Sequence, residues 1–230
     1  MHEFLTESVF FGAFASLAFY QIGVFCRKKW KLAVLNPLLI AIVLTIVMLV
    51  VFHIDYDTYY EGAKYLSYLL TPATICLAIP LYEQYTLLKQ NLRAVLAGIF
   101  AGVVTSLVLV LLLALLFHLS HEEYITFLPK SVTTAIGMGV SGEMGGNVSI
   151  TAAVIIITGV LGNILADPVC RLFRITEPVA KGVGIGSASH AIGTARAMEM
   201  GEIEGAMSSL SIAVAGVLTV FLSIPFSCLY

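Results

Sequence analysis

The chain has 230 residues, of which 59% are hydrophobic and only 11% are charged. Soluble domains carry about 25% charged residues, so this composition predicts an integral membrane protein with no separate soluble domain. The net charge of −2 is too small to indicate nucleic acid or an acidic surface as a partner. At about 20 residues per crossing, the length predicts one domain over 1–230. The fold class is all-α, a polytopic transmembrane helical bundle of about seven or eight membrane segments.

Basic and acidic flanks order the first membrane segments. The first predicted span, Phe4–Phe25, has no basic region before it and precedes a basic cluster at 27–31. The positive-inside rule places that cluster in the cytoplasm and the N-terminus outside, so the segment is expected to be a span and not a cleaved signal peptide. The next predicted spans are Leu38–Phe52, Tyr59–Glu83 and Ala94–Phe117.

Prolines interrupt the third of these segments. Pro72 lies at its middle and Pro80 near its end. Proline removes a helical hydrogen bond and leaves a carbonyl free, so an interrupted helix is predicted here. Thr71 and Thr74 flank this break, and they would bind a substrate if a second interrupted helix crossed the first.

The region from Pro129 to Asn147 leaves two topologies open. Pro129–Ser141 is predicted to be a helix, but about 13 residues rise only about 20 Å, less than a hydrocarbon core of about 30 Å. It ends in a Gly-rich stretch at 142–147, and the full-length span Val148–Ala166 leads to a third basic cluster at 171–181. If that cluster is cytoplasmic, 129–141 is a re-entrant half-helix with its Gly-rich tip at membrane depth. If both segments cross, the cluster faces outward. The re-entrant alternative is favoured.

A stretch of small residues, Gly182–Glu199, separates two apolar segments. Its Gly/Ser cluster predicts a break at Ser187–Ser189 that exposes unpaired backbone to a cavity. In the re-entrant topology, 177–196 runs from inside to outside and places the acidic group at 199–204 outside. Two interrupted helices of opposite direction indicate a binding site at the bilayer midplane of an inverted-repeat transporter.

His190 and Arg196 are costly at membrane depth unless a partner or water compensates them. One interpretation is recognition of a carboxylate, in which Arg196 supplies a planar fork and His190 a donor or proton carrier. The alternative is that Arg196 reaches the interface near Glu199 while His190 is a satisfied packing residue.

Further polar residues are candidates because of their places along these segments. Hydroxyl groups on the two broken elements would bind substrate oxygens, although such hydroxyls often bond the preceding carbonyls instead. Asn147 would bind substrate, or it forms part of a turn. Glu143 would couple protons or pair with Arg196 if its segment is buried, and it is merely solvated otherwise. Lys130 would attract an anion or anchor an interface. The predicted substrate-binding hydroxyls are those of Ser131, Thr134, Ser187, Ser189 and Thr194, with those of Thr71 and Thr74.

No enzyme signature is found: there is no P-loop, dinucleotide fingerprint, HExxH motif or GxSxG elbow. The four cysteines lie in apolar segments without CxxC spacing and are interpreted as small apolar residues. The sequence therefore predicts neither catalysis nor a cofactor or metal.

Three segments carry a resemblance to a known family. They are L-L-T-P-A-T-I-C-L-A-I-P-L-Y-E-Q (69–84), P-K-S-V-T-T-A-I-G-M (129–138) and G-I-G-S-A-S-H-A-I-G-T-A-R-A-M-E (184–199). They resemble the LrgB/CidB family of bacterial inner-membrane proteins. The family is named for control of murein hydrolase export and lysis, in a holin- or antiholin-like scheme with a smaller partner, LrgA or CidA. It is also similar to the plastid glycolate/glycerate translocator, and bacterial relatives are linked to pyruvate movement.

The chain departs from the family pattern near Gly142–Asn147. Ala135 stands where the family commonly has proline, Asn147-Val148 replace an Ile-Pro-like pair, and Glu143 is not expected from the pattern. These changes put in doubt whether the substrate or coupling ion is the same.

Two functional hypotheses follow from the residues and the resemblance. The leading one is alternating-access transport of a small monocarboxylate (pyruvate, glycolate, lactate or glycerate class), alone or with an LrgA-like partner. The alternative is a holin/antiholin-like membrane protein that controls murein hydrolase export and lysis by oligomerisation. Both place a multi-pass protein in the inner membrane, and the small-residue content predicts a homodimer or higher oligomer.

Overall fold

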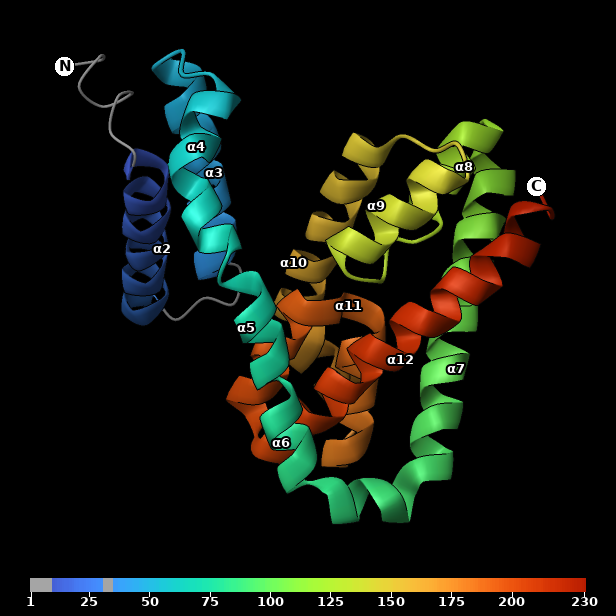
Figure 1. Cartoon of the computed structure of the whole chain (residues 1–230). Coiled ribbons are helices and arrows are strands. Elements are labelled where there is room, and N and C mark those ends of the chain that lie inside the picture. Colours follow the sequence, from blue (N-terminus) through green and yellow to red (C-terminus); the bar gives the residue numbers. More distant parts are fainter. Residues whose placement is uncertain (1–9, 31–34) are drawn as a thin grey trace. The chain divides into compact units, whose positions relative to one another are not determined.

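The computed structural model describes residues 10–30 and 35–230 (Figure 1). Within these residues every regular element is an α-helix, which confirms the all-α prediction. The elements are α2 (Phe11–Trp30), α3 (Pro37–Val51), α4 (Tyr56–Ser67), α5 (Leu70–Cys76), α6 (Ala78–Glu83), α7 (Tyr85–Phe117), α8 (His121–Phe127), α9 (Thr134–Glu143), α10 (Val148–Leu172), α11 (Pro178–Met200) and α12 (Glu202–Ser227).

Four stretches of the described residues are long and apolar enough to cross a membrane: Tyr56–Glu83, Tyr85–Phe117, Val148–Leu172 and Glu202–Ser227. The 15-residue α3 is also apolar. These stretches identify a helical membrane protein. The count of seven or eight segments stays a prediction, and residues 4–9 of the first predicted span lie outside the described residues.

The described chain forms two compact units, the first ending at Cys76 and the second spanning Leu77–Tyr230. In the first unit, α2 packs closely on α3 and α4 because glycines face its neighbours. A Cβ added to Gly12 would lie 2.5 Å from the backbone nitrogen of Ala63, and one added to Gly23 would lie 2.7 Å from Cα of Pro37. The Ser16 and Tyr59 hydroxyls, 2.6 Å apart, join α2 to α4.

The predicted interruption of 59–83 is present. Helices α4, α5 and α6 are separate, and Pro72 and Pro80 lie in the first turns of α5 and α6, where a missing N–H breaks no helical bond. Thr71 is exposed on α5, whereas the side chain of Thr74 lies outside the described part of the structure. Both belong to the first unit, so a cavity that they share with α11 stays a prediction.

In the second unit, α7 and α12 end at the same end of the fold, beside α8. The Tyr124 hydroxyl of α8 donates to the carbonyl of Phe226 at 2.8 Å, and Tyr230 donates to that of Ala114 at 3.3 Å. α8 begins with a capping box in which Ser120 and Glu123 bond each other's backbone N–H. The core of the unit joins α7, α8, α11 and α12 around Ile99, Leu107, Ile125 and Met207, with Tyr124.

A first hairpin is formed by α8, the turn at 129–133 and α9. The Ser131 hydroxyl lies 3.0 Å from that of Ser106, so this turn, called here the first tip, reaches an interior position of α7. α9 then runs back, and the N–H of Asn147 donates to Thr126 Oγ1 of α8 at 2.8 Å. The structure thus corrects the sequence prediction: the buried tip is 129–133, not the Gly-rich stretch at 142–147. Pro129 lacks an N–H and cannot continue α8, while Gly145 (φ +85°) only reverses the chain beside α8.

A second hairpin lies within α11, which Figure 1 shows bent (orange). His190 has φ +42° and ψ −143°, so the helix breaks there, just after the predicted Ser187–Ser189. Residues 187–191 are called the second tip. Both ends of α11 lie at one end of the unit, because Lys181 Nζ is 3.9 Å from Glu204 Oε1 and Arg196 pairs with Asp167.

The expectation that 177–196 crosses the membrane, with the acidic group at 199–204 opposite the basic cluster, is therefore wrong. The oppositely charged residues attract each other and share one end of the fold. α12 contacts both halves of α11: a Cβ on Gly186 would lie 2.8 Å from Cα of Ser208, and Thr194 Oγ1 lies 2.7 Å from Ser208 Oγ.

Candidate functional site: two hairpin tips and a charged cleft

Glycines of α10 hold the second tip. His190 is only 2% exposed, and its Nε2 lies 3.0 Å from the carbonyl oxygen of Ile155. A Cβ on Gly159 would lie 2.7 Å from the His190 ring, and one on Gly162 would overlap the side chain of Ser189. Because small residues let helices approach in lipid, these two glycines allow the broken backbone to lie against α10.

Other polar groups of the second tip are also satisfied within the chain. Thr194 Oγ1 donates to the carbonyl of His190 at 3.0 Å in addition to its contact with Ser208. Ser187 donates to the carbonyl of Val183 at 2.7 Å. Asn163 Nδ2 donates to the carbonyl of Ile192 at 2.8 Å. These bonds correspond to the alternative in which the hydroxyls and His190 serve the fold. The binding role predicted for them is untested and stays a prediction.

The two tips meet at a small cavity of about 10 Å³, lined by four residues with hydroxyl groups and three apolar residues. This is the size that holds one water molecule. Hydroxyl groups from four elements line it: Ser106 of α7, Ser131 of the first tip, Ser187 of the second tip and Thr219 of α12. Ser131 and Ser187 are two of the predicted substrate-binding residues, and both line this cavity.

A positive charge lies beside this cavity. Lys130 is half-buried and its Nζ donates to Ser131 Oγ at 3.0 Å. Within residues 10–30 and 35–230, no carboxylate oxygen lies within 4 Å of that ammonium group. An ionisable side chain inside a membrane domain is costly, which makes Lys130 a candidate for binding an anion, as one of the two sequence alternatives proposed.

Arg196 lies away from the tips, at the charged end of the unit. Its Nε donates to Asp167 Oδ2 at 2.9 Å, its Nη2 reaches the same oxygen, and its Nη1 pairs with Glu199. The guanidinium group of Arg196 is therefore already paired with carboxylates of the same chain. Its pairing with Glu199 agrees with the alternative in which Arg196 lies at the membrane interface near Glu199. Arg196 lines a cleft of about 710 Å³ with Asp167, Arg171, Arg174, Lys181 and Glu204.

The remaining predicted residues lie apart from the two tips. Glu143 is exposed at the end of α9, so a buried acid is not found there, and it is not a partner of Arg196. Asn147 caps α10, because its Oδ1 accepts from the N–H of Ile150 at 3.1 Å. Thr134 is half-buried at the first residue of α9, next to the first tip.

Sequence reasoning missed several residues of this region. Ser106 and Thr219 are single hydroxyls within apolar spans and give no local signal. Asp167 did give a local signal, because it is an acidic residue next to an apolar run. The predicted span ended at Ala166, however, and so left Asp167 out. The structure extends α10 to Leu172 with Pro168 inside it.

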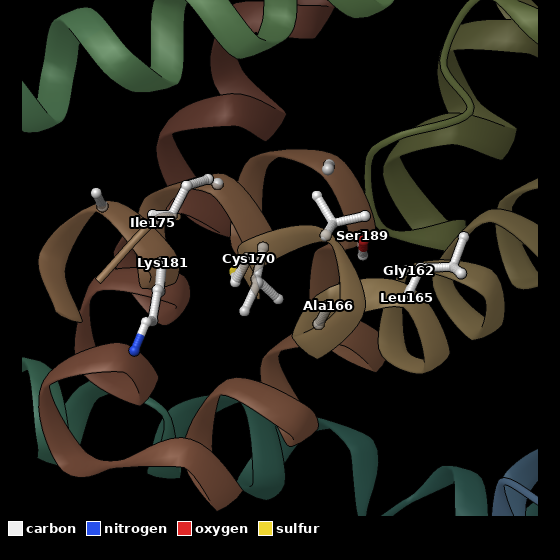
Figure 2. A pocket seen from close by; sticks show the side chains of 12 residues that line it. Gly162, Leu165, Ala166, Cys170, Ile175, Lys181 and Ser189 are labelled. Carbon is white, nitrogen blue, oxygen red and sulfur yellow. The ribbon is translucent and has the colours of Figure 1, made fainter. Parts of the chain in front are cut away.

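An apolar groove of about 210 Å³ lies between α10 and the first half of α11 (Figure 2). Figure 2 shows Ser189 and Gly162 at one side of this pocket and Lys181 at the other. Ser189 is 4% exposed. The groove and the charged cleft share Cys170, Ile175 and Lys181 in their linings, so they are adjacent.

Comparison with known proteins places the chain in a family. The model of the LrgB-like family matches residues 16–228. The antiholin-like protein LrgB of Bacillus subtilis (strain 168) is 38% identical over 216 residues, which cover 94% of each chain. The antiholin-like protein LrgB of Bacillus mycoides (strain KBAB4) has the same identity and coverage. No solved structure matches the chain significantly. The match over nearly the whole length, together with the motifs that resembled this family, shows that the chain belongs to the LrgB-like family.

Proposed function

We propose that this chain is an antiholin-like, multi-pass protein of the bacterial inner membrane that restrains murein hydrolase export and lysis, acting with a smaller LrgA-like membrane partner. The observation that carries the proposal is the 38% identity to proteins named antiholin-like, over 94% of both chains. This was the second of the two sequence hypotheses, and the relatives' names favour it over the first.

The packing of the second unit restricts how such a protein would oligomerise. Gly159 and Gly162 contact the second tip, and Gly182 and Gly186 contact α12. These small-residue faces are occupied within the chain, so a homodimer would have to use other surfaces.

The test is complementation of a bacterial strain that lacks its own LrgB. Expression of the full chain should lower extracellular murein hydrolase activity and delay lysis relative to an empty vector. Gly139→Ala serves as a matched variant, since it adds only a methyl group in open space and should behave like the parent. Unchanged lysis, with the protein present in the membrane at the same level as a functional relative, would refute the proposal.

A second candidate function is transport of a small monocarboxylate by alternating access. It is favoured by one observation: two hairpins from opposite ends of the unit meet at hydroxyl groups beside Lys130, which has no carboxylate partner in the described chain. Helices interrupted near the midplane form the substrate sites of inverted-repeat transporters. A carboxylate would supply the missing counter-charge to Lys130, and the hydroxyls of Ser131 and Ser187 would bind its oxygens.

The size of the cavity adds a requirement to this candidate. About 10 Å³ holds one water molecule but not a pyruvate-sized anion. The tips must therefore separate before substrate binds. The first tip is the one that would move, because His190 of the second tip is packed against Gly159 and bonded to Ile155.

The test for transport is uptake of labelled pyruvate, glycolate and lactate into proteoliposomes. Saturable uptake is expected, with KM raised by about tenfold in Lys130→Gln, because one charge-assisted hydrogen bond contributes about 1.5 kcal/mol or more. Lys89→Gln is the matched control, since Lys89 is exposed on α7. Equal and unselective leakage of all three solutes from every variant would exclude a carboxylate transporter and leave the antiholin-like function.

A further inference from the structure

The groove between α10 and α11 has the walls of a site for a hydrocarbon chain. Apolar and small side chains, including Leu165, Val169, Ile185 and Ala188, form most of its lining. Its volume of about 210 Å³ is many times that of the one-water cavity between the tips, enough for a segment of an acyl chain. Gly184 lines this groove beside open space, because a Cβ added there would meet no atom within 4 Å.

The cleft adjacent to this groove carries excess positive charge. Four cationic and two acidic side chains line it. Lys181 and Arg196 already face Glu204 and Asp167. Within the described residues, however, Arg171 and Arg174 have no carboxylate oxygen within 4 Å. The cleft therefore has two arginines left for an anion.

An apolar groove adjacent to a cationic cleft matches the two parts of an anionic lipid. Basic pockets between membrane helices on the cytoplasmic side bind anionic lipid headgroups, and the positive-inside rule places this basic cluster on that side. We propose that groove and cleft together bind one anionic phospholipid, with an acyl chain along Gly184 and Ala188 and the phosphate near Arg171, Arg174 and Lys181. The site does not depend on whether the chain controls lysis or transports carboxylates.

The headgroup is tested by measuring lipid binding to the full-length protein with native mass spectrometry, using phosphatidylglycerol and phosphatidylcholine. The protein should retain phosphatidylglycerol in preference to phosphatidylcholine. Each basic residue near an anionic lipid contributes about as much as a fivefold change in affinity, so Arg171→Gln with Arg174→Gln should weaken phosphatidylglycerol binding by about thirtyfold. The matched control is Lys89→Gln with Arg93→Gln, which removes two positive charges from another predicted cytoplasmic region and should change little.

The acyl chain is tested by filling the groove. Gly184→Leu adds a side chain in open space at the groove, and Ala188→Leu enlarges a lining side chain one turn later. Both should lower phosphatidylglycerol binding by about tenfold, as expected when a few methylene contacts are lost. Gly139→Leu adds the same side chain in open space on α9, outside the groove, and should bind like the parent. Thermal unfolding checks that each variant is folded.

Three results would overturn the proposal. Equal retention of the two lipids by the parent would show that the cleft does not select an anionic headgroup. Unchanged binding in both groove variants would mean that a headgroup or free phosphate binds to the arginines alone. Equal loss in the Lys89/Arg93 control would show general attraction to the membrane surface and not a site.

Discussion

The two hairpin tips reach the same cavity but are built in different ways. The first tip, 129–133, is a turn between two separate helices and carries Lys130, which is half-buried and lacks a carboxylate partner in the described chain. The second tip breaks a single helix at His190, which is 2% exposed and bonded to Ile155. Its backbone has a positive φ of 42°, a conformation that costs a non-glycine residue about 1–3 kcal/mol.

This difference assigns the two tips different roles. Strained backbone persists only where the surroundings fix it, and at the second tip Gly159 and Gly162 bring α10 against His190 and Ser189. The second tip is therefore a fixed structural joint. The first tip carries the positive charge of Lys130, which has no carboxylate partner in the described chain, and it makes fewer buried polar contacts than the second tip. The first tip is therefore the part able to respond to an anion. The predictions below test whether the second tip depends on packing more than the first.

The largest effect is expected for Gly162→Ala. The new Cβ would overlap Oγ and Cβ of Ser189, and Ser189 cannot move without shifting the break at His190. Overpacking costs about 1–3 kcal/mol, and we expect the upper end, about 3 kcal/mol, in the free energy of unfolding measured in mixed micelles. Gly137→Ala on α9 is the comparison. Its Cβ would meet the flexible end of Ile155, so a loss of less than about 1 kcal/mol is expected. Equal losses would show that the tips are packed alike.

The next effect concerns the strain at His190. His190→Ala removes the bond to Ile155 and leaves a cavity, at a cost of about 2–3 kcal/mol, and the strained backbone remains. His190→Gly removes the same groups but relieves the strain, so it should be about 1 kcal/mol more stable than the alanine variant. Both are measured by the same unfolding titration. An alanine variant as stable as the glycine variant would show that the break costs no strain.

Local signals in the sequence identified the break in α11, because the Gly/Ser run before His190 weakens a helix. The turn at 129–133 was missed: proline is favoured at a helix start, so a helix was predicted over 129–141, whereas α9 begins only at Thr134. Local signals did not show which turn is buried inside the fold. The stretches 129–133 and 142–147 both break the helix, and only contacts distant in sequence, Ser106 with Ser131 and Thr126 with Asn147, decide which one is buried.

The direction of α11 was mispredicted for a related reason. The positive-inside rule placed the basic cluster at 171–181 in the cytoplasm, and the re-entrant topology then made 177–196 cross the membrane, which put the acidic residues at 199–204 on the opposite side. In the structure Lys181 faces Glu204 and Arg196 pairs with Asp167. Attraction between the two groups brings both ends of α11 together. The composition of the helix does not predict which charged residues pair.

A moderate effect is expected for the Arg196–Asp167 pair, which anchors the outer end of the second hairpin. The side chains are 24% and 33% exposed, so solvent screening reduces their interaction. A double-mutant cycle with Arg196→Gln and Asp167→Asn should give a coupling energy of about 1 kcal/mol in the free energy of unfolding. The exposed pair Lys64–Glu61 is the control and should give about 0.3 kcal/mol. Coupling no larger than that of the control would mean that Arg196 does not hold the hairpin.

The smallest effect is expected for Thr194→Val, which removes one hydroxyl between the second tip and α12. Interhelical hydrogen bonds in membranes contribute about 0.6 kcal/mol on average, so a loss of that size is expected in the same titration. Thr45→Val is the matched control, because Thr45 bonds only the carbonyl of Ala41 in its own helix, at 2.8 Å. Ser131→Ala at the first tip should cost less than Thr194→Val, since Ser131 is half-buried and Thr194 is 1% exposed. The reverse order would place the tighter joint at the first tip and assign the mobile role to the second.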